Sequence, residues 1–257
     1  EALRLNSSGT VVGVTSQGAF LRAEDRITFL TAANYLSPFN LTLGMGEKLF
    51  EMLAVGDEFT VNPEGVIFPA AGIVLRTAAA RVWQPPSPMP LKTTFAQQRE
   101  LIDPIIQQLR QKDASKGYLF LAKADEGLTE TQFQVAQAAE AVSSSFTTGD
   151  LERFIAAAGK LLGSGSGLTP SGDDFLTGFF LYHFRLDMPT GQRRSKVEDW
   201  CAWLTGEAFK KTTKISANRL MAAARGWSEE IFLTLIDHLF DPEIPFGEDL
   251  ARTLMAI

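Results

Sequence analysis

Two patterns of hydrophobic spacing follow one another along the chain. Residues 10–83 alternate short apolar or β-branched runs with turn-forming Gly, Asn and Pro. This alternation is typical of strands in an antiparallel barrel or sandwich. The predicted strands are 10–14, 19–21, 26–30, 39–43, 58–61, 65–68 and 72–75, with a short helix at 47–53. We therefore expect a β-rich first part of the chain.

A proline-rich segment ends this pattern. Residues 83–90 read Trp-Gln-Pro-Pro-Ser-Pro-Met-Pro. Because proline fixes φ and lacks a backbone N–H, neither a strand nor a helix continues through such a run. The segment therefore predicts a linker between domains.

Beyond the linker, apolar residues recur with the period of a helix. Helices are expected at 96–111, 129–145, 149–162, 171–185, 197–211, 216–226 and 228–240, with a polar loop at 188–195. The chain is thus predicted to be α+β. A β-rich barrel-like or sandwich domain at 1–84 is followed by a linker at 85–95 and an all-α domain at 96–257.

Composition narrows the functional classes. The chain has 257 residues and a formal net charge of −6, which disfavours nucleic-acid binding. Cys201 is the only cysteine of the sequence, and His183 and His238 are its only histidines, so an internal disulfide is excluded and a thiolate metal site is disfavoured. All three are expected to be packed residues rather than catalytic ones. No membrane span or signal peptide is evident, and we expect a cytoplasmic protein.

A glycine-rich run stands between two predicted helices. Residues 163–174, the glycine motif, read Gly-Ser-Gly-Ser-Gly-Leu-Thr-Pro-Ser-Gly-Asp-Asp. Its alternating glycines can adopt positive φ and bring backbone N–H groups close to a ligand. Thr169 or Ser171 is a suitable N-cap, Pro170 suits a first helical turn, and Ser171 to Asp174 resembles a capping box. A helix is therefore expected to begin here.

A glycine loop that leads into a helix N-terminus favours phosphate or carboxylate, because free N–H groups and the helix dipole meet there. The residues predicted to bind substrate in this motif are Gly163, Gly165, Gly167, Thr169, Ser171 and Gly172. The motif is neither a Walker loop nor a dinucleotide-binding fingerprint. The alternative to a binding site is a purely structural loop that leads into a well-capped buried helix. Against this alternative, each glycine weakens the local structure, which costs stability if the loop has no other role.

The adjacent carboxylates Asp173 and Asp174 would repel an anion if both faced it. Neighbouring helical residues point about 100° apart, so one is expected to complete the cap while the other faces the ligand. We predict catalytic roles for Ser171, Asp173 and Asp174. Mg²⁺ is a candidate cofactor, since it is held by one or two carboxylates together with substrate oxygens.

Basic residues lie further along the chain. Lys210, Lys211, Lys214 and Arg219 could place positive charge opposite the glycine motif. The favoured interpretation is a basic helix end that interacts with its own dipole.

The pattern Gly-x-Gly-x-Gly-Leu-Thr-Pro-Ser-Gly-Asp-Asp-x-Leu-x-Gly at 163–178 resembles the signature of a bacterial family of formerly unknown function. This family includes AllH, a subunit of oxamate carbamoyltransferase. Residues 213–216 are similar to a second family region, which adds Ser216 to the expected substrate-binding residues. Residues 37–40 resemble a turn in the family's β-rich half.

The resemblance implies a role in purine (allantoin) catabolism. There, three different subunits interconvert oxamate and carbamoyl phosphate with oxalurate and phosphate. It also implies partner subunits, and a second Gly-His-Ser/Thr-Ser-Gly-x-Asp motif, expected beyond Ile257 or on a partner. The alternative is a non-catalytic subunit that binds a small anion or serves assembly.

Overall fold

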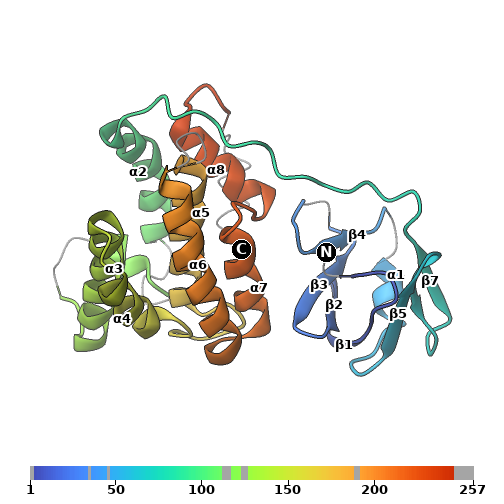
Figure 1. Cartoon of the computed structure of the whole chain (residues 1–257). Coiled ribbons are helices and arrows are strands. Elements are labelled where there is room, and N and C mark those ends of the chain that lie inside the picture. Colours follow the sequence, from blue (N-terminus) through green and yellow to red (C-terminus); the bar gives the residue numbers. More distant parts are fainter. Residues whose placement is uncertain are drawn as a thin grey trace. The chain divides into compact units, whose positions relative to one another are not determined.

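The protein was analysed as a computed structural model that describes residues 3–33, 36–44, 47–111, 117–122, 127–187 and 192–245. The chain divides into two compact units, Glu1–Pro85 and Pro86–Ile257. Every described strand belongs to the first unit, and the long helices belong to the second (Figure 1). The predicted α+β class is confirmed.

The first unit is a curled seven-stranded sheet in the order β4-β3-β2-β1-β5-β6-β7. Its elements are β1 (Ser8–Thr15), β2 (Gly18–Ala23), β3 (Arg26–Thr31), β4 (Asn40–Thr42), α1 (Glu47–Phe50), β5 (Glu58–Asn62), β6 (Gly65–Phe68) and β7 (Ile73–Arg76). Alternating side chains of the strands fill one core, in which Leu21, Leu30, Phe59 and Phe68 are fully buried. The period-two spacing of the sequence therefore builds one apolar face of the sheet.

One strand differs from the predicted antiparallel pattern. β4 pairs with β3 in parallel, with Phe29 opposite Asn40. A parallel partner cannot be joined by a tight hairpin and needs a longer connection, which the apolar spacing of the strand itself does not reveal. All other neighbouring strands are antiparallel.

The second unit is helical. Its elements are α2 (Phe95–Gln111), the 3-10 turn η1 (Leu119–Ala122), α3 (Glu130–Thr148), α4 (Leu151–Leu161), α5 (Ser171–Asp187), α6 (Gln192–Lys211), α7 (Lys214–Ala223) and α8 (Glu230–Phe240). α3, α4 and α7 begin behind side-chain caps provided by Thr129, Asp150 and Thr213. α5 begins at Ser171, as predicted. α6 begins at Gln192, inside the segment expected to be a polar loop.

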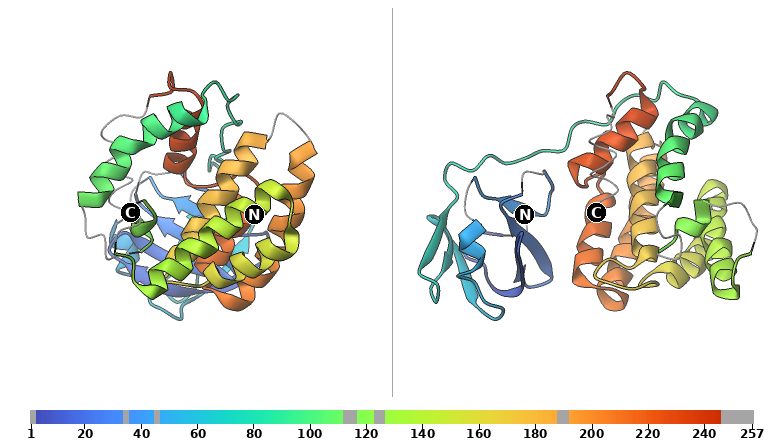
Figure 2. Two further views of the ribbon diagram at one scale, coloured as in Figure 1. Left: turned by 90° about the vertical axis from the view of Figure 1, so that its left-hand side faces the viewer. Right: turned by 180° about the vertical axis from the view of Figure 1, so that it is seen from behind.

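Aromatic residues join the helices around α5, which packs against α4, α6 and α7 (Figure 2). Phe154 of α4 lies 5.8 Å from Phe180 of α5 and 4.5 Å from Trp200 of α6, as measured between ring centroids. All three rings are almost completely buried. These contacts join the middle of α5 to α4 and α6. Among the helices described, none is long and apolar enough to cross a membrane.

Candidate functional site

The glycine motif connects α4 to α5 by a sharply folded loop. Gly163, Gly165 and Gly167 have φ values of 77°, 112° and 92°, so all three adopt the left-handed backbone predicted for them. A Cβ on Gly163 would lie 2.7 Å from the Lys211 carbonyl oxygen, and one on Gly165 would lie 2.7 Å from the Ser171 nitrogen. At these two positions glycine is required by space as well as by φ.

Asp173 holds the loop in place. Its side chain is buried, and it accepts a hydrogen bond from the Gly163 N–H at 2.7 Å and another from the Thr212 hydroxyl. The neighbouring Thr213 hydroxyl donates to the Leu168 carbonyl at 2.6 Å. The loop is therefore tied at both ends to the junction between α6 and α7.

Backbone donors of the motif fall into two groups. The N–H of Ser164 donates to Leu161 at 2.9 Å, that of Gly172 to Ser164 at 2.9 Å, and those of Asp173 and Asp174 to Pro170 at 2.9 and 3.1 Å. The N–H groups of Gly172, Asp173 and Asp174 in the first turn of α5 thus have acceptors, although the sequence pointed to this turn as a source of free donors. By contrast, the N–H groups of 165–169 have no acceptor among the residues that the structure describes. The N–H groups without an acceptor in the described part of the chain therefore lie on the loop.

Asp174 differs from Asp173 in its surroundings, because its side chain is 47% exposed. Its Oδ1 lies 3.3 Å from Nη1 of Arg219 in α7. Arg219 also pairs with Glu229 at 3.2 Å and lies over the ring of Phe232 at 5.8 Å. Burial raises the pKa of the Asp174 carboxyl, the Arg219 charge opposes that rise, and the Asp173 charge adds to it.

The raised pKa predicts how Asp174 affects stability. Between the unfolded pKa of about 3.9 and the higher folded pKa, the folded protein binds more protons than the unfolded chain. The contribution of Asp174 to the free energy of unfolding therefore falls as the pH rises through this window. In urea denaturation at a series of pH values, the difference between Asp174→Asn and the wild type should shift in favour of the variant as the pH rises. A difference that is independent of pH would contradict the raised pKa.

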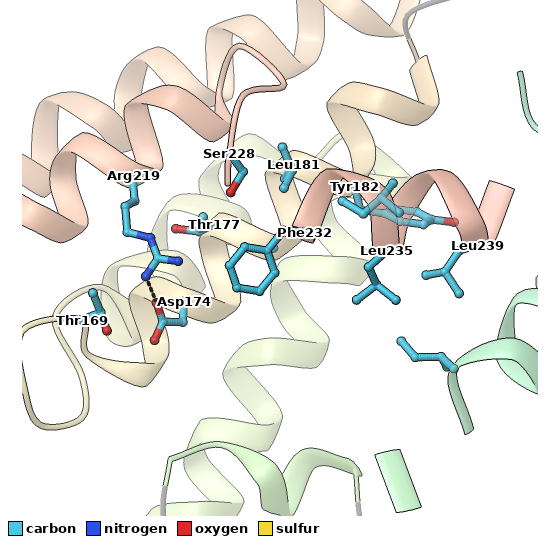
Figure 3. A pocket seen from close by; sticks show the side chains of 13 residues that line it. Thr169, Asp174, Thr177, Leu181, Tyr182, Arg219, Ser228, Phe232, Leu235 and Leu239 are labelled. Carbon is cyan, nitrogen blue, oxygen red and sulfur yellow. Dashed lines mark hydrogen bonds and ion pairs between the residues drawn. The ribbon is translucent and has the colours of Figure 1, made fainter. Parts of the chain in front are cut away.

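A cavity of about 470 Å³ opens beside Asp174. Figure 3 shows Thr169, Asp174 and Arg219 at one end of it and Leu235, Leu239 and Tyr182 at the other. It is lined by Ile102, Thr169, Asp174, Thr177, Gly178, Leu181, Tyr182, Arg219, Ser228, Phe232, Leu235, Ile236 and Leu239. Thr169 and Asp174 are the predicted site residues that reach this cavity.

A second group of hydroxyls lies on another side of the motif. The Tyr118 hydroxyl and Ser164 Oγ share a short hydrogen bond, and burial raises the pKa of Tyr118. A Cβ on Gly117 would lie 3.0 Å from Ser171 Oγ, so the segment at Tyr118 adjoins the start of α5. The sequence gives no sign of this tyrosine, because it lies far from the motif along the chain.

Ser216 is buried in the first turn of α7, and its hydroxyl has no hydrogen-bond partner within the described part of the chain. It does not line the cavity. Lys210 and Lys211 pair with Glu207 at 2.9 and 3.6 Å, and Lys214 lies over Phe209. These contacts fit the interpretation of a basic helix end.

The two histidines and the cysteine, which were expected to be packed residues, all contact neighbouring parts of the helical unit or are buried in it. His183 contacts the rings of Phe146, Phe179 and Tyr182. Cys201 is buried, which raises the pKa of its thiol well above the usual range. His238 Nδ1 lies 2.7 Å from the Ile244 carbonyl oxygen.

Mg²⁺ does not fit the carboxylates of the motif. Both oxygens of Asp173 accept hydrogen bonds, from Gly163 and Thr212, and Asp174 faces the Arg219 guanidinium. Among the described residues, no group of three or more His, Cys, Asp or Glu side chains could hold a metal ion. No step is therefore assigned to a metal.

Comparison with known proteins relates this site to one family. No curated protein and no solved structure matches the chain. A family model described as oxamate carbamoyltransferase subunit AllH matches residues 161–256, from the last turn of α4 through the glycine motif and α5 to α8. From residue 161 onward the chain is thus similar to oxamate carbamoyltransferase subunit AllH, which confirms over this segment the resemblance seen in the motif.

Proposed function

We propose that the chain is a subunit of an oxamate-carbamoyltransferase-like enzyme, and that its glycine motif binds a small anion: oxamate, oxalurate or carbamoyl phosphate. The observation that carries this proposal is the set of loop N–H groups at 165–169 that have no acceptor within the described residues. Such groups on a glycine-rich loop are suited to phosphate or carboxylate oxygens. The motif also lies inside the segment that matches the family.

The proposed chemistry follows from this placement. The amide nitrogen of oxamate attacks the carbamoyl carbon of carbamoyl phosphate, the bond from this carbon to the phosphate oxygen breaks, and the nitrogen loses a proton. Loop N–H groups would stabilise the negative charge that develops on the carbonyl oxygen. The raised pKa of Asp174 suits it to accept the proton, and Ser171 would add a hydroxyl donor.

The three predicted catalytic residues then differ in role. Asp173 is buried and holds Gly163 and Thr212, which supports a positioning role rather than contact with the substrate. Full activity of the reconstituted assembly with both Asp173→Ala and Asp174→Ala would contradict any part for these carboxylates in catalysis. It would favour the alternative of a non-catalytic subunit that binds an anion or serves assembly in purine (allantoin) catabolism.

Binding of the anion is the direct test. Calorimetry of the full chain with oxamate, carbamoyl phosphate and inorganic phosphate should detect binding of at least one of them. Ser171→Ala should weaken that binding about tenfold, as expected for a hydrogen bond to a charged group. Ser144→Ala is the matched control, since the Ser144 hydroxyl donates only to Ala141 of its own helix. The proposal fails if none of the three anions binds to the wild type.

A further inference from the structure

The cavity beside Asp174 is poorly matched to the small anions proposed for the loop. Most of its wall is apolar, formed by Leu235, Ile236 and Leu239 of α8, Leu181 of α5 and Ile102 of α2. Oxamate and carbamoyl phosphate have no apolar part to place against these side chains, and they would lose hydration there. A volume of about 470 Å³ lies in the range of sites for larger organic ligands. The cavity therefore calls for a different ligand.

The charged groups of this cavity are gathered at one end. Thr169, Asp174 and Arg219 lie together there, while the far end is formed by Leu235, Leu239 and Tyr182, whose hydroxyl already donates to Gln98 at 2.8 Å (Figure 3). A ligand that satisfies both ends has a compact polar head and an apolar body. This division of polar and apolar lining is usual in small-molecule sites, where a few polar groups fix the orientation.

The charges at the polar end select the kind of head. Arg219 is already held by Asp174 at 3.3 Å and by Glu229 at 3.2 Å. A carboxylate head would meet Asp174 and a guanidinium that two carboxylates already neutralise, and an ammonium head would meet that guanidinium. An uncharged amide avoids both repulsions, because its N–H groups can donate to Asp174 while its carbonyl accepts from Arg219.

We propose that this cavity is a binding site for an uncharged amide or urea that carries an apolar substituent. The head lies against the paired Asp174 and Arg219, and the substituent lies along Phe232 towards Leu235 and Leu239. The glycine motif contributes Thr169 and Asp174 to this cavity. The inference rests on the lining of the cavity and not on anion binding by the loop, so hexanamide can bind whether or not the small anions do.

A series of ligands that share one tail tests the head group. Saturation-transfer NMR titrations of the full chain should show hexanamide binding more tightly than hexanoate or hexylammonium. Acetamide, which has the same head and almost no tail, should bind at least about tenfold more weakly than hexanamide. The proposal is overturned if hexanoate binds more tightly than hexanamide, or if acetamide binds equally well.

A pair of glycine variants tests the location. Gly178 of α5 lines the cavity, and nothing lies within 4 Å of a Cβ built on it. Gly178→Leu should therefore take up cavity volume and weaken hexanamide binding about tenfold or more. Gly206 of α6 is equally open but does not line the cavity, so Gly206→Leu should bind hexanamide like the wild type. Unchanged binding in Gly178→Leu would place the ligand elsewhere and overturn the assignment.

Discussion

Replacing Arg185 with methionine should lower the free energy of unfolding of the helical unit by about 3–5 kcal/mol, the usual cost of removing one partner from a buried ion pair. Arg185 is 1% exposed. Its Nη2 lies 2.5 and 2.7 Å from the two carboxylate oxygens of Asp237 in α8, and its Nη1 donates to the Pro86 carbonyl at 3.3 Å. Methionine keeps most of the apolar packing but leaves the Asp237 carboxylate buried without its cation.

Urea denaturation followed by tryptophan fluorescence measures this loss, because Trp200, Trp203 and Trp227 belong to the helical unit. Arg153→Met replaces an exposed arginine of α4 and should change the stability by no more than about 0.5 kcal/mol. Combining Arg185→Met with Asp237→Leu removes both charges, so the double variant should be more stable than Arg185→Met alone. A single variant within about 1 kcal/mol of the wild type would show that Asp237 finds another partner.

Local signals in the sequence were sufficient to predict most elements. The start of α5 at Ser171 follows from Pro170 and from the polar residues around it, all within a few positions of one another. The positive φ values of Gly163, Gly165 and Gly167 are likewise predicted by the alternation of glycines in the loop. β4 shows the limit of such signals, since the apolar spacing of 39–43 indicates a strand but carries no information on its direction relative to β3.

The contacts that shape the site could not be predicted in this way. Asp173 accepts a hydrogen bond from the Thr212 hydroxyl, which lies 39 positions further along the chain. Asp174 accepts one from Arg219, which lies 45 positions further along. Both contacts depend on how α6 and α7 pack against α5, which the period of a single helix does not determine. The apolar cavity likewise combines α2, α5 and α8. The domain borders predicted at 84 and 96 and the roles of the individual site residues stay predictions.

The second large effect is expected at Gly172, where the glycine is required by space alone. A Cβ on this residue would lie 1.9 Å from the Leu161 carbonyl oxygen and 2.5 Å from Ser164 Oγ. The Gly172 N–H also donates to the Ser164 carbonyl at 2.9 Å, so the loop cannot move away without losing this hydrogen bond. Gly172→Ala should therefore destabilise the helical unit by about 2–3 kcal/mol, at the upper end of the usual cost of overpacking.

Gly178 provides the matched control for this substitution, because it belongs to the same helix and has open space around it. Gly178→Ala should raise the free energy of unfolding by up to about 1 kcal/mol, since alanine favours the helix over glycine. The two variants therefore change stability in opposite directions, although the chemical change is the same. Equal effects in urea denaturation would mean that Gly172 does not contact the end of α4. In that case α5 would begin in a different position, and the loop donors at 165–169 would no longer be placed as described.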